Sequence, residues 1–292
     1  MGAQHQKIWL ITGTSSGFGK RLVASVLARG DCVVATARNL EKLQSMFSSM
    51  GAERRRLRLL QLDISDCAEI VQERVNEALA MWGRIDVVVN NAGYGLKAII
   101  EEGGSLAALS QFQTNIFGVL NVTNAILPHM RERRAGTVVI IGSRSAWRAE
   151  ASPAGFYAAS KAAIHAIGET YSTELRPFGI RVLIVAPGAF RTEGVHSYPV
   201  TINRHVPAYD EMREAGMARF AAIAGHEKGD PAKAMELVVD VVKGEGKAKG
   251  REWPLWLILG RDAYTDVRNK CHKVLRTMDA WEDVATDLEF DC

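Results

Sequence analysis

The sequence predicts an α/β protein built on a doubly wound parallel sheet of seven strands, with helices on both faces. Short apolar and β-branched runs recur along the chain, and longer segments of helical periodicity separate them, as in βαβ units. A glycine-rich segment follows the first of these runs and leads into an amphipathic helix. With 292 residues, 47% of them apolar and 24% charged, the chain can bury a sizeable core in a single domain over residues 1–292.

Seven apolar runs are expected to form the strands, and they lie at Ile8–Ile11, Cys32–Thr36, Leu57–Leu62, Ile85–Asn90, Gly136–Ile141, Ile180–Ala186 and Leu255–Leu259. The first helix is expected over 17–29, because its apolar residues share one stripe and Gly30 is a good C-terminal stop. A later helix is expected over 231–242. Its start is marked by Asp230, which can accept from unpaired amides, and by Pro231, which suits the first helical position.

The longest region without clear periodicity runs from Gly188 to about Gly229. A connection of this length in a compact domain usually has a function. We therefore expect residues 189–229 to form a loop region that covers a substrate pocket, with Val195 and Tyr198 among the side chains that face it.

Charge and cysteine content argue against several classes of protein. The formal net charge is +3, and the one dense basic run, Arg54-Arg55-Arg56-Leu57-Arg58, is best interpreted as a solvated turn before a strand. The four cysteines lack CxxC spacing and the seven histidines lack an HExxH motif, so we expect no metal and a reducing compartment. No apolar run is long enough to span a bilayer. We expect a cytoplasmic protein without a nucleic-acid partner.

The glycine-rich segment has the properties of a dinucleotide site. Gly13, Gly17 and Gly19 lie between an apolar strand and an amphipathic helix, with the spacing GxxxGxG. In that context they allow a tight turn, close backbone approach to phosphate and tight packing of helix on sheet. The helix start offers backbone amides to a pyrophosphate. We expect residues 13–19, including Ser15, Ser16 and Phe18, to bind the cofactor.

Tyr157 and Lys161 lie one helical turn apart, so the phenol and the ammonium share a face. A neighbouring cation favours the ionised phenol, whose ordinary pKa of about 10 would otherwise make it a weak base. Ser143 follows an apolar strand and can donate to a substrate oxygen that gains charge. Together with the glycine segment, these residues indicate hydride transfer coupled to proton transfer, as in a carbonyl reductase.

The motifs in chain order carry a family resemblance, and they are Thr12-Gly13-x-x-x-Gly17-x-Gly19, Asn90-Asn91-Ala92-Gly93, Asn115, Ser143, Tyr157, Lys161 and Pro187-Gly188. Over nearly its whole length the chain resembles a compact, single-domain short-chain dehydrogenase/reductase with a Rossmann-type fold. The resemblance implies that Tyr157 acts as general acid or base, that Ser143 holds the substrate oxygen, and that Lys161 binds the nicotinamide ribose and eases ionisation of Tyr157. It further implies that Asn115 supports a water-linked proton relay. Residues Asn90, Ala92 and Gly93 are implied to lie along the cofactor.

The choice of serine departs from the family pattern. Ser143 lies one residue farther from Tyr157 than the family's serine does, whereas Ser145 lies one residue nearer. We favour Ser143 because it continues the apolar strand without a break, and an extra residue in the following loop explains the offset. Ser145 remains the alternative.

The end of the second strand decides which dinucleotide is preferred. An acidic residue there would accept from the adenosine ribose, but this chain has Ala37 followed by Arg38. An arginine suits a 2′-phosphate, so we predict NADP(H) as the cofactor. By resemblance, Asp63 and Ile64 contact the adenine, Pro187 and Gly188 flank the cofactor, and Thr192 contacts the nicotinamide carboxamide.

The expected function is an NADP(H)-dependent oxidoreductase that interconverts a ketone or aldehyde and its alcohol, with reduction favoured and a medium-sized, largely apolar substrate. The segment Leu259–Tyr264 resembles members similar to retinol and 17β-hydroxysteroid dehydrogenases. The alternative is a catalytically silent NADP-sensing binding protein of the same fold. The resemblance also implies a homo-oligomer, dimer or tetramer, in which helices at about 105–131 and 154–176 pair across a two-fold axis.

Overall fold

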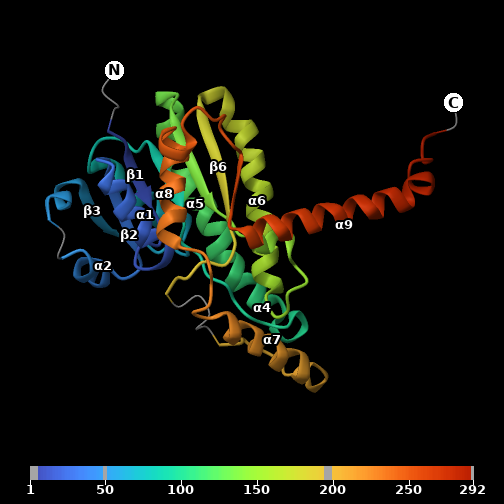
Figure 1. Ribbon diagram of the computed structural model, residues 1–292. Helices are drawn as coiled ribbons and strands as arrows, with labels where there is room; N and C mark the ends of the chain where they lie inside the picture. Colours follow the sequence, from blue (N-terminus) through green and yellow to red (C-terminus); the bar gives the residue numbers. More distant parts are fainter. Residues whose placement is uncertain (1–5, 49–50, 194–198, 291–292) are drawn as a thin grey trace.

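The computed structural model describes residues 6–48, 51–193 and 199–290. Within them lies one sheet of seven parallel strands in the order β3-β2-β1-β4-β5-β6-β7 (Figure 1). The strands are Ile8–Ile11 (β1), Cys32–Ala37 (β2), Leu57–Gln61 (β3), Val87–Asn90 (β4), Gly136–Ile141 (β5), Ile180–Pro187 (β6) and Trp256–Leu259 (β7). The predicted fold class is confirmed. The chain order reverses between β1 and β4, which is where ligands bind in open sheets of this kind.

The described part of the chain contains nine α-helices, and they are Gly17–Ala28 (α1), Leu40–Met46 (α2), Ala68–Ala80 (α3), Ile100–Phe112 (α4), Val119–Arg133 (α5), Gly155–Leu175 (α6), Asp210–Ile223 (α7), Pro231–Lys243 (α8) and Arg261–Ala285 (α9). Short 3-10 turns occupy Ala52–Arg56, Arg144–Trp147, Arg176–Phe178, Pro207–Tyr209 and Gly246–Ala248, and a π-helical segment occupies Gln113–Gly118.

The core consists of two apolar layers, one on each face of the sheet. On one face, α3, α5 and α6 pack through residues such as Val71, Ile126 and Ile164. On the other face, α1 and α8 pack through residues such as Val26 and Val238. Successive strand residues alternate between the two layers because neighbouring side chains of a strand point to opposite faces. Both faces are therefore covered, as the sequence predicts.

The expected loop over 189–229 is wrong for part of its length, because residues 210–223 form α7. This helix has no apolar stripe, and only Arg213 and Gly216 of it are buried. Its sequence is instead rich in Ala, Glu, Arg and Met, which favour helix without any periodic pattern. Positions 194–198, which include Val195 and Tyr198, lie outside the described residues.

The helix expected at about 105–131 is divided into α4, the π-helical segment and α5, while α6 matches the helix expected at 154–176 closely. Gly104 adopts a positive φ of 56° inside α4 and produces a further kink. Helical periodicity continues across such irregularities, so the sequence does not reveal them.

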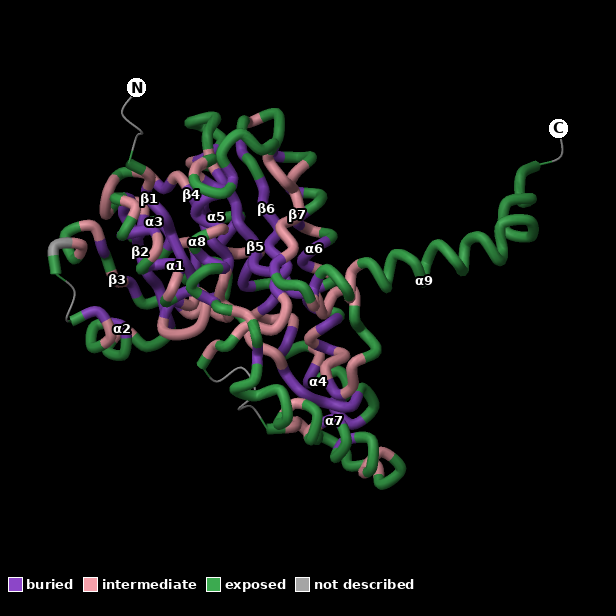
Figure 2. The backbone as a smooth tube through the Cα atoms, viewed as in Figure 1, coloured by how far each residue is buried: buried purple, intermediate pink, exposed green. Residues whose placement is uncertain are grey.

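α9 differs from the other long helices because it leaves the body of the molecule. It extends away from the sheet toward the C-terminus (Figure 1), and nearly all of it is exposed (Figure 2). Ala263, close to its beginning, is its single buried residue. Over the described residues, no helix has both the length and the continuous apolar character needed to cross a membrane.

Candidate active site

The glycine segment is shaped by contacts that leave no room for side chains. Gly13 has a positive φ of 68°, and a Cβ atom there would lie 2.7 Å from the Cα atom of Ala92. Gly17 also has a positive φ, of 56°, and a Cβ atom on Gly19 would collide with the carbonyl oxygen of Gly13. The three glycines therefore permit the turn from β1 into α1 at the switch point of the sheet.

Two side chains outside the predicted set fix this turn against β4. The Asn91 side chain donates to the carbonyl oxygens of Thr12 (2.8 Å) and Gly13 (3.0 Å). The buried Thr12 hydroxyl accepts from the backbone N–H groups of Asn91 and Ala92, both at 3.0 Å. Thr12 and Asn91 both belong to the family motifs, but their polar contacts connect positions far apart in the sequence.

The N-terminus of α1 holds a carboxylate that the sequence analysis did not single out. Ser16 precedes the helix with an extended backbone and makes no side-chain capping bond. Glu193 Oε2 accepts instead from the Gly17 N–H (2.9 Å) and pairs with the Arg21 guanidinium (2.8 Å). The hydrogen bond from Arg21 is the main cause that lowers the pKa of Glu193 to about 2. An anionic group is thus favourable at this helix start.

Tyr157 and Lys161 come from α6, and Ser143 lies directly after β5. The Ser143 side chain lies close enough to the Tyr157 hydroxyl to lower the pKa of that hydroxyl. The Lys161 Nζ atom is buried, donates to the carbonyl oxygen of Ile141 (2.7 Å) and lies 5.9 Å from the centre of the Tyr157 ring. The structure therefore brings the three predicted catalytic side chains together at the carboxyl end of β5.

The expected lowering of the Tyr157 pKa is wrong for the polypeptide alone. Burial raises the pKa of Tyr157 above its ordinary value, and the hydrogen bond with Ser143 opposes this only in part. Burial also lowers the pKa of Lys161 to about 8. Desolvation exceeds the opposing effect of Ser143 on Tyr157, while Lys161 directs its Nζ atom to a backbone carbonyl. Tyr157 is consequently protonated at neutral pH.

Asn115 is positioned by the π-helical segment, a distortion that often occurs at functional sites. Its side chain donates to the carbonyl oxygen of Tyr94 and to the Ser160 hydroxyl, both at 3.0 Å. Ser160 in turn donates to the backbone carbonyl of Tyr157 (2.8 Å). A Cβ atom on Gly93 would lie 3.0 Å from the Asn115 Oδ1 atom and 3.7 Å from the Lys161 Nζ atom. Gly93 thus leaves space for both groups.

The backbone of Ser143 is held by His165, which lies on α6 one turn beyond Lys161. The Ser143 N–H donates to His165 Nε2 (3.2 Å), and the Ser145 N–H donates to the Ser143 hydroxyl (3.0 Å). The rings of His165, Trp147 and Trp256 contact one another in a triangle, with His165 4.8 Å from Trp147 and 4.7 Å from Trp256. Burial lowers the pKa of His165 to about 3, so its ring is neutral and can accept.

Geometry separates the two candidate serines. Ser143 contacts Tyr157 through its side chain, whereas Ser145 contributes its backbone N–H to Ser143. This arrangement favours Ser143 as the residue that meets a substrate oxygen.

The predicted adenosine-binding residues lie at the ends of β2 and β3. Arg38 is exposed, and within the described ranges no carboxylate forms an ion pair with it. Asp63 accepts from the backbone N–H (2.9 Å) and the hydroxyl (2.6 Å) of Ser65. The Ile64 carbonyl packs so closely on Gly118 that a side chain there would collide with it. Asn90, which the resemblance implies to lie along the cofactor, donates to the buried Thr123 hydroxyl (2.9 Å). This hydrogen bond ties β4 to α5.

The segment after β6 closes the other side of the site. The Gly188 N–H donates to the Leu259 carbonyl (2.8 Å), so Pro187 and Gly188 are held beside β7. Phe190 packs edge to face on Phe18 at 5.4 Å. The Thr192 methyl group lies 3.9 Å from where a Gly17 Cβ atom would be. The structure therefore brings Thr192 over the glycine segment.

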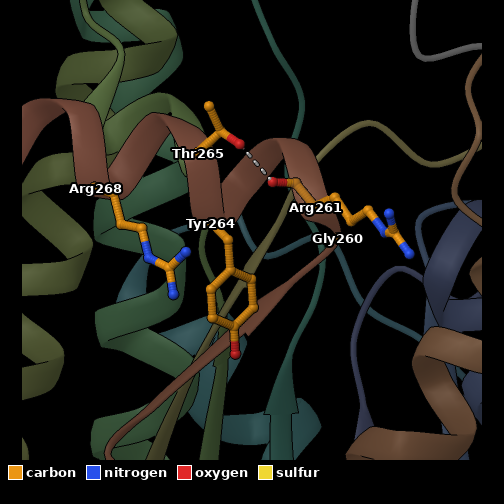
Figure 3. A pocket seen from close by; sticks show the side chains of 5 residues that line it. All are labelled: Gly260, Arg261, Tyr264, Thr265 and Arg268. Carbon is orange, nitrogen blue, oxygen red and sulfur yellow. Dashed lines mark hydrogen bonds between the residues drawn. The ribbon is translucent and has the colours of Figure 1, made fainter.

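The beginning of α9 adjoins this segment. Asp262 accepts from the Ala189 N–H (2.7 Å) and pairs with Arg144 (2.7 Å), which follows Ser143. Arg144 also pairs with Asp266 (3.0 Å). An open pocket lies here, and its walls are Gly260, Arg261, Tyr264, Thr265 and Arg268 (Figure 3). These contacts anchor the root of α9 at the carboxyl ends of the strands, where Ser143 also lies.

The region after Thr192 returns to the loop beside Tyr157. Gly95 packs on the Tyr157 ring, and Lys97 forms a parallel bridge with Val200. Farther on, Arg213 of α7 pairs with the buried Glu102 of α4 (3.3 Å). These contacts connect the region around α7 to the loop that borders the tyrosine.

Comparison with known proteins agrees with this geometry. Residues 7–201 match the family described as short chain dehydrogenase. The oxidoreductase BOA17 of Botryotinia fuckeliana is 32% identical over 284 residues, which cover 96% of this chain and 98% of the relative. The chain belongs to the short-chain dehydrogenase/reductase family. Human retinol dehydrogenase 8 matches a smaller part of the chain. It is 37% identical over 190 residues, which cover 63% of this chain and 59% of that protein.

Solved structures give the same result. A short-chain dehydrogenase from Streptomyces avermitilis is 34% identical, with a TM-score of 0.84 over 98% of this chain and 100% of its own. ElxO with NADP bound has a TM-score of 0.72 at 23% identity, over 89% of this chain and all of its own. A short-chain dehydrogenase/reductase from Burkholderia phymatum in complex with NAD has a TM-score of 0.79 at 20% identity, over 95% of this chain and 97% of its own. At identities of 23% and 20%, the last two structures show only that this chain has the same fold. This chain is thus an oxidoreductase of the short-chain dehydrogenase/reductase family.

Proposed function

We propose that the protein is an NADP(H)-dependent oxidoreductase that interconverts a ketone or aldehyde and its alcohol, with reduction as the favoured direction. The contact between the Tyr157 and Ser143 hydroxyls, with Lys161 one turn along α6, carries this proposal. A carbonyl oxygen placed against both hydroxyls meets two donors at the point where it gains negative charge.

The residues at the sheet switch point fit a dinucleotide. The glycine segment has no side chains in the way of a phosphate, and the amide at the start of α1 already binds one carboxylate, that of Glu193. Arg38 at the end of β2 offers a planar, charged donor set, which suits a 2′-phosphate better than free ribose hydroxyls. NADPH bound here would supply the hydride.

Proton transfer is the part of the reaction that the chain itself performs. Because burial raises the pKa of Tyr157, its hydroxyl carries a proton at neutral pH and can give it to the substrate oxygen as the C–H bond forms. The Tyr157 oxygen is then left negative. Lys161, whose pKa is lowered to about 8, can return a proton to it, and Asn115 holds the neighbouring backbone in place. This protonation state supports the reductive direction.

The substrate is proposed to be medium-sized and largely apolar. The region around α7, with the loop beside Tyr157, forms the wall that such a substrate would contact. The printed name of retinol dehydrogenase 8 indicates an apolar alcohol for that relative. That name favours an apolar ketone or aldehyde over a charged sugar as the substrate of this chain.

The test is NADPH oxidation with a panel of ketones and aldehydes that differ in size and polarity. We expect turnover to be greatest with apolar members and to fall by about 100- to 10,000-fold in Tyr157→Phe. NADPH binding should persist in that variant. Tyr171→Phe is the matched control, because its hydroxyl lies on the same helix but donates to Asn124. Intact NADPH binding without turnover of any compound would instead identify a silent nucleotide-binding protein.

A further inference from the structure

α9 carries an apolar stripe that no other part of the described chain covers. Its members recur at alternating intervals of four and three residues, and they are Val267, Cys271, Val274, Met278, Trp281 and Ala285. We call these six residues the α9 seam. Val274 is 45%, Met278 60% and Trp281 62% exposed. This spacing is the heptad pattern by which one helix packs along another, so the seam has the form of a helix-pairing surface.

The part of α9 from Val267 to Ala285, which we call the arm, is long enough for such pairing. Its root is fixed to the body by the ion pairs of Arg144 with Asp262 and Asp266. Beyond that root the seam from Val267 to Ala285 extends for about 27 Å at 1.5 Å per residue, roughly five helical turns. Figure 2 shows this length standing free of the body. Large exposed apolar side chains in one continuous row indicate an interaction surface rather than scattered surface residues.

Charge along α9 indicates what the seam binds. The first half of the arm is basic, with Arg268, Lys270, Lys273 and Arg276. The second half is acidic, with Asp279, Glu282 and Asp283, and the acidic residues Asp287 and Glu289 follow the helix. A second α9 helix that runs in the opposite direction would place the basic half of each helix against the acidic half of the other. The surface is therefore complementary to itself across a two-fold axis.

The same charge distribution disfavours a lipid surface. Helix α9 contains five basic and five acidic residues, namely Arg261, Arg268, Lys270, Lys273 and Arg276 against Asp262, Asp266, Asp279, Glu282 and Asp283. Its formal net charge is zero, and its distal half is acidic. Anionic lipid would repel that half, whereas interfacial helices are usually rich in Lys and Arg.

We propose that α9 pairs in antiparallel orientation with α9 of a second copy of the chain, and that the α9 seam forms the contact. A two-fold axis near Arg276 places Val274 against Met278 of the second copy, and Cys271 against its Trp281. Arg268 then flanks Glu282 of the second copy. The acidic end of one arm lies along the basic first half of the other, toward the pocket of Arg261 and Arg268 (Figure 3).

The first test measures mass in solution by size-exclusion chromatography with light scattering on the full chain. The Met278→Glu/Trp281→Glu variant should have half the mass of the wild type at equal concentration, with NADPH binding unchanged. The matched control is Asn269→Glu/Ala280→Glu, which adds the same charge on the opposite side of the helix and should keep the wild-type mass. Equal masses for the wild type and the seam variant overturn the proposal.

A second test determines the orientation. In a Cys67→Ser/Cys292→Ser background, oxidation should leave the chains unlinked, because antiparallel pairing keeps the two Cys271 residues apart. Adding Trp281→Cys should produce a covalent dimer through Cys271 of one copy and position 281 of the other. Linkage in the background alone would mean parallel pairing and would refute the antiparallel model.

A third test addresses membranes directly. Vesicles of phosphatidylcholine and phosphatidylserine are mixed with the wild type and the seam variant and separated by flotation. We expect neither protein to float. Flotation of the wild type alone, at a mass equal to that of the variant, would mean that the seam binds lipid and not a second copy.

Discussion

Glu193 accepts a hydrogen bond from the backbone N–H of Gly17 at 2.9 Å, although 176 positions separate the two residues. The same carboxylate oxygen lies 2.8 Å from the Arg21 guanidinium. A side chain thus occupies the start of α1, where backbone amides and the helix dipole attract anions. A pyrophosphate at this helix start would have to displace it. The loop after Thr192 and the cofactor therefore compete for one amide.

From this competition we expect Glu193→Gln to bind NADPH more tightly than the wild type. The Glu193 side chain is 51% exposed, so its ion pair is weak and screened, and the gain should be roughly two- to fivefold in Kd. Quenching of tryptophan fluorescence by NADPH measures it. Glu211→Gln removes an exposed carboxylate at the start of α7 and serves as the control for net charge. An unchanged or weaker affinity in Glu193→Gln would contradict the competition.

Much of the fold was predictable because its signals are local. The Asp230-Pro231 start of α8 and the glycine stop after α1 mark helix ends through neighbouring residues alone. The π-helical segment at Gln113–Gly118 lacks such a signal, and the tight packing of its Gly118 against Ile64 joins positions far apart in the sequence. Helix α7 lacks an apolar stripe, so periodicity could not find it.

The candidate site was predictable to a similar degree. Ser143, Tyr157 and Lys161 stand on neighbouring strand and helix ends, and motif spacing brings them together. The contact of Glu193 with Gly17 and that of His165 with Ser143 connect separate loops or helices, and no spacing rule encodes them. The direction of the Tyr157 pKa also depends on burial, which sequence spacing does not give.

Arg38 should decide between the two dinucleotides. In Arg38→Asp, the ratio of kcat/KM for NADPH to that for NADH should fall by at least about tenfold, because a carboxylate repels a 2′-phosphate and accepts from free ribose hydroxyls. Steady-state kinetics with each cofactor measures the ratio. Arg55→Asp makes the same charge change at an exposed site before β3 and should leave the ratio unchanged. A wild-type enzyme that already prefers NADH would refute this assignment.

The pKa of Lys161 predicts a pH limit for reduction. Because burial lowers this pKa to about 8, the ammonium is charged below that pH and loses its proton above it. The kcat/KM for NADPH, which reports the free enzyme, should therefore be level below pH 8 and fall about tenfold per unit above it. Lys161→Arg should be less active but should show no fall up to about pH 10. A wild-type profile that stays level to pH 10 would mean that the charge on Lys161 is not required.

His165 should make stability depend on pH. Its pKa is about 3 in the folded protein and about 6.5 in an unfolded chain, so between these values the unfolded state binds a proton that the folded state does not. The free energy of unfolding should therefore fall as pH falls below about 6.5, by up to about 1.4 kcal/mol per unit. His165→Gln keeps an acceptor for the Ser143 N–H but cannot titrate, so urea unfolding between about pH 5 and 6.5 should show a shallower slope. His226→Gln, at an exposed position, should retain the wild-type slope. Equal slopes for His165→Gln and the wild type would mean that His165 binds protons alike in the folded and unfolded states, so that burial does not lower its pKa.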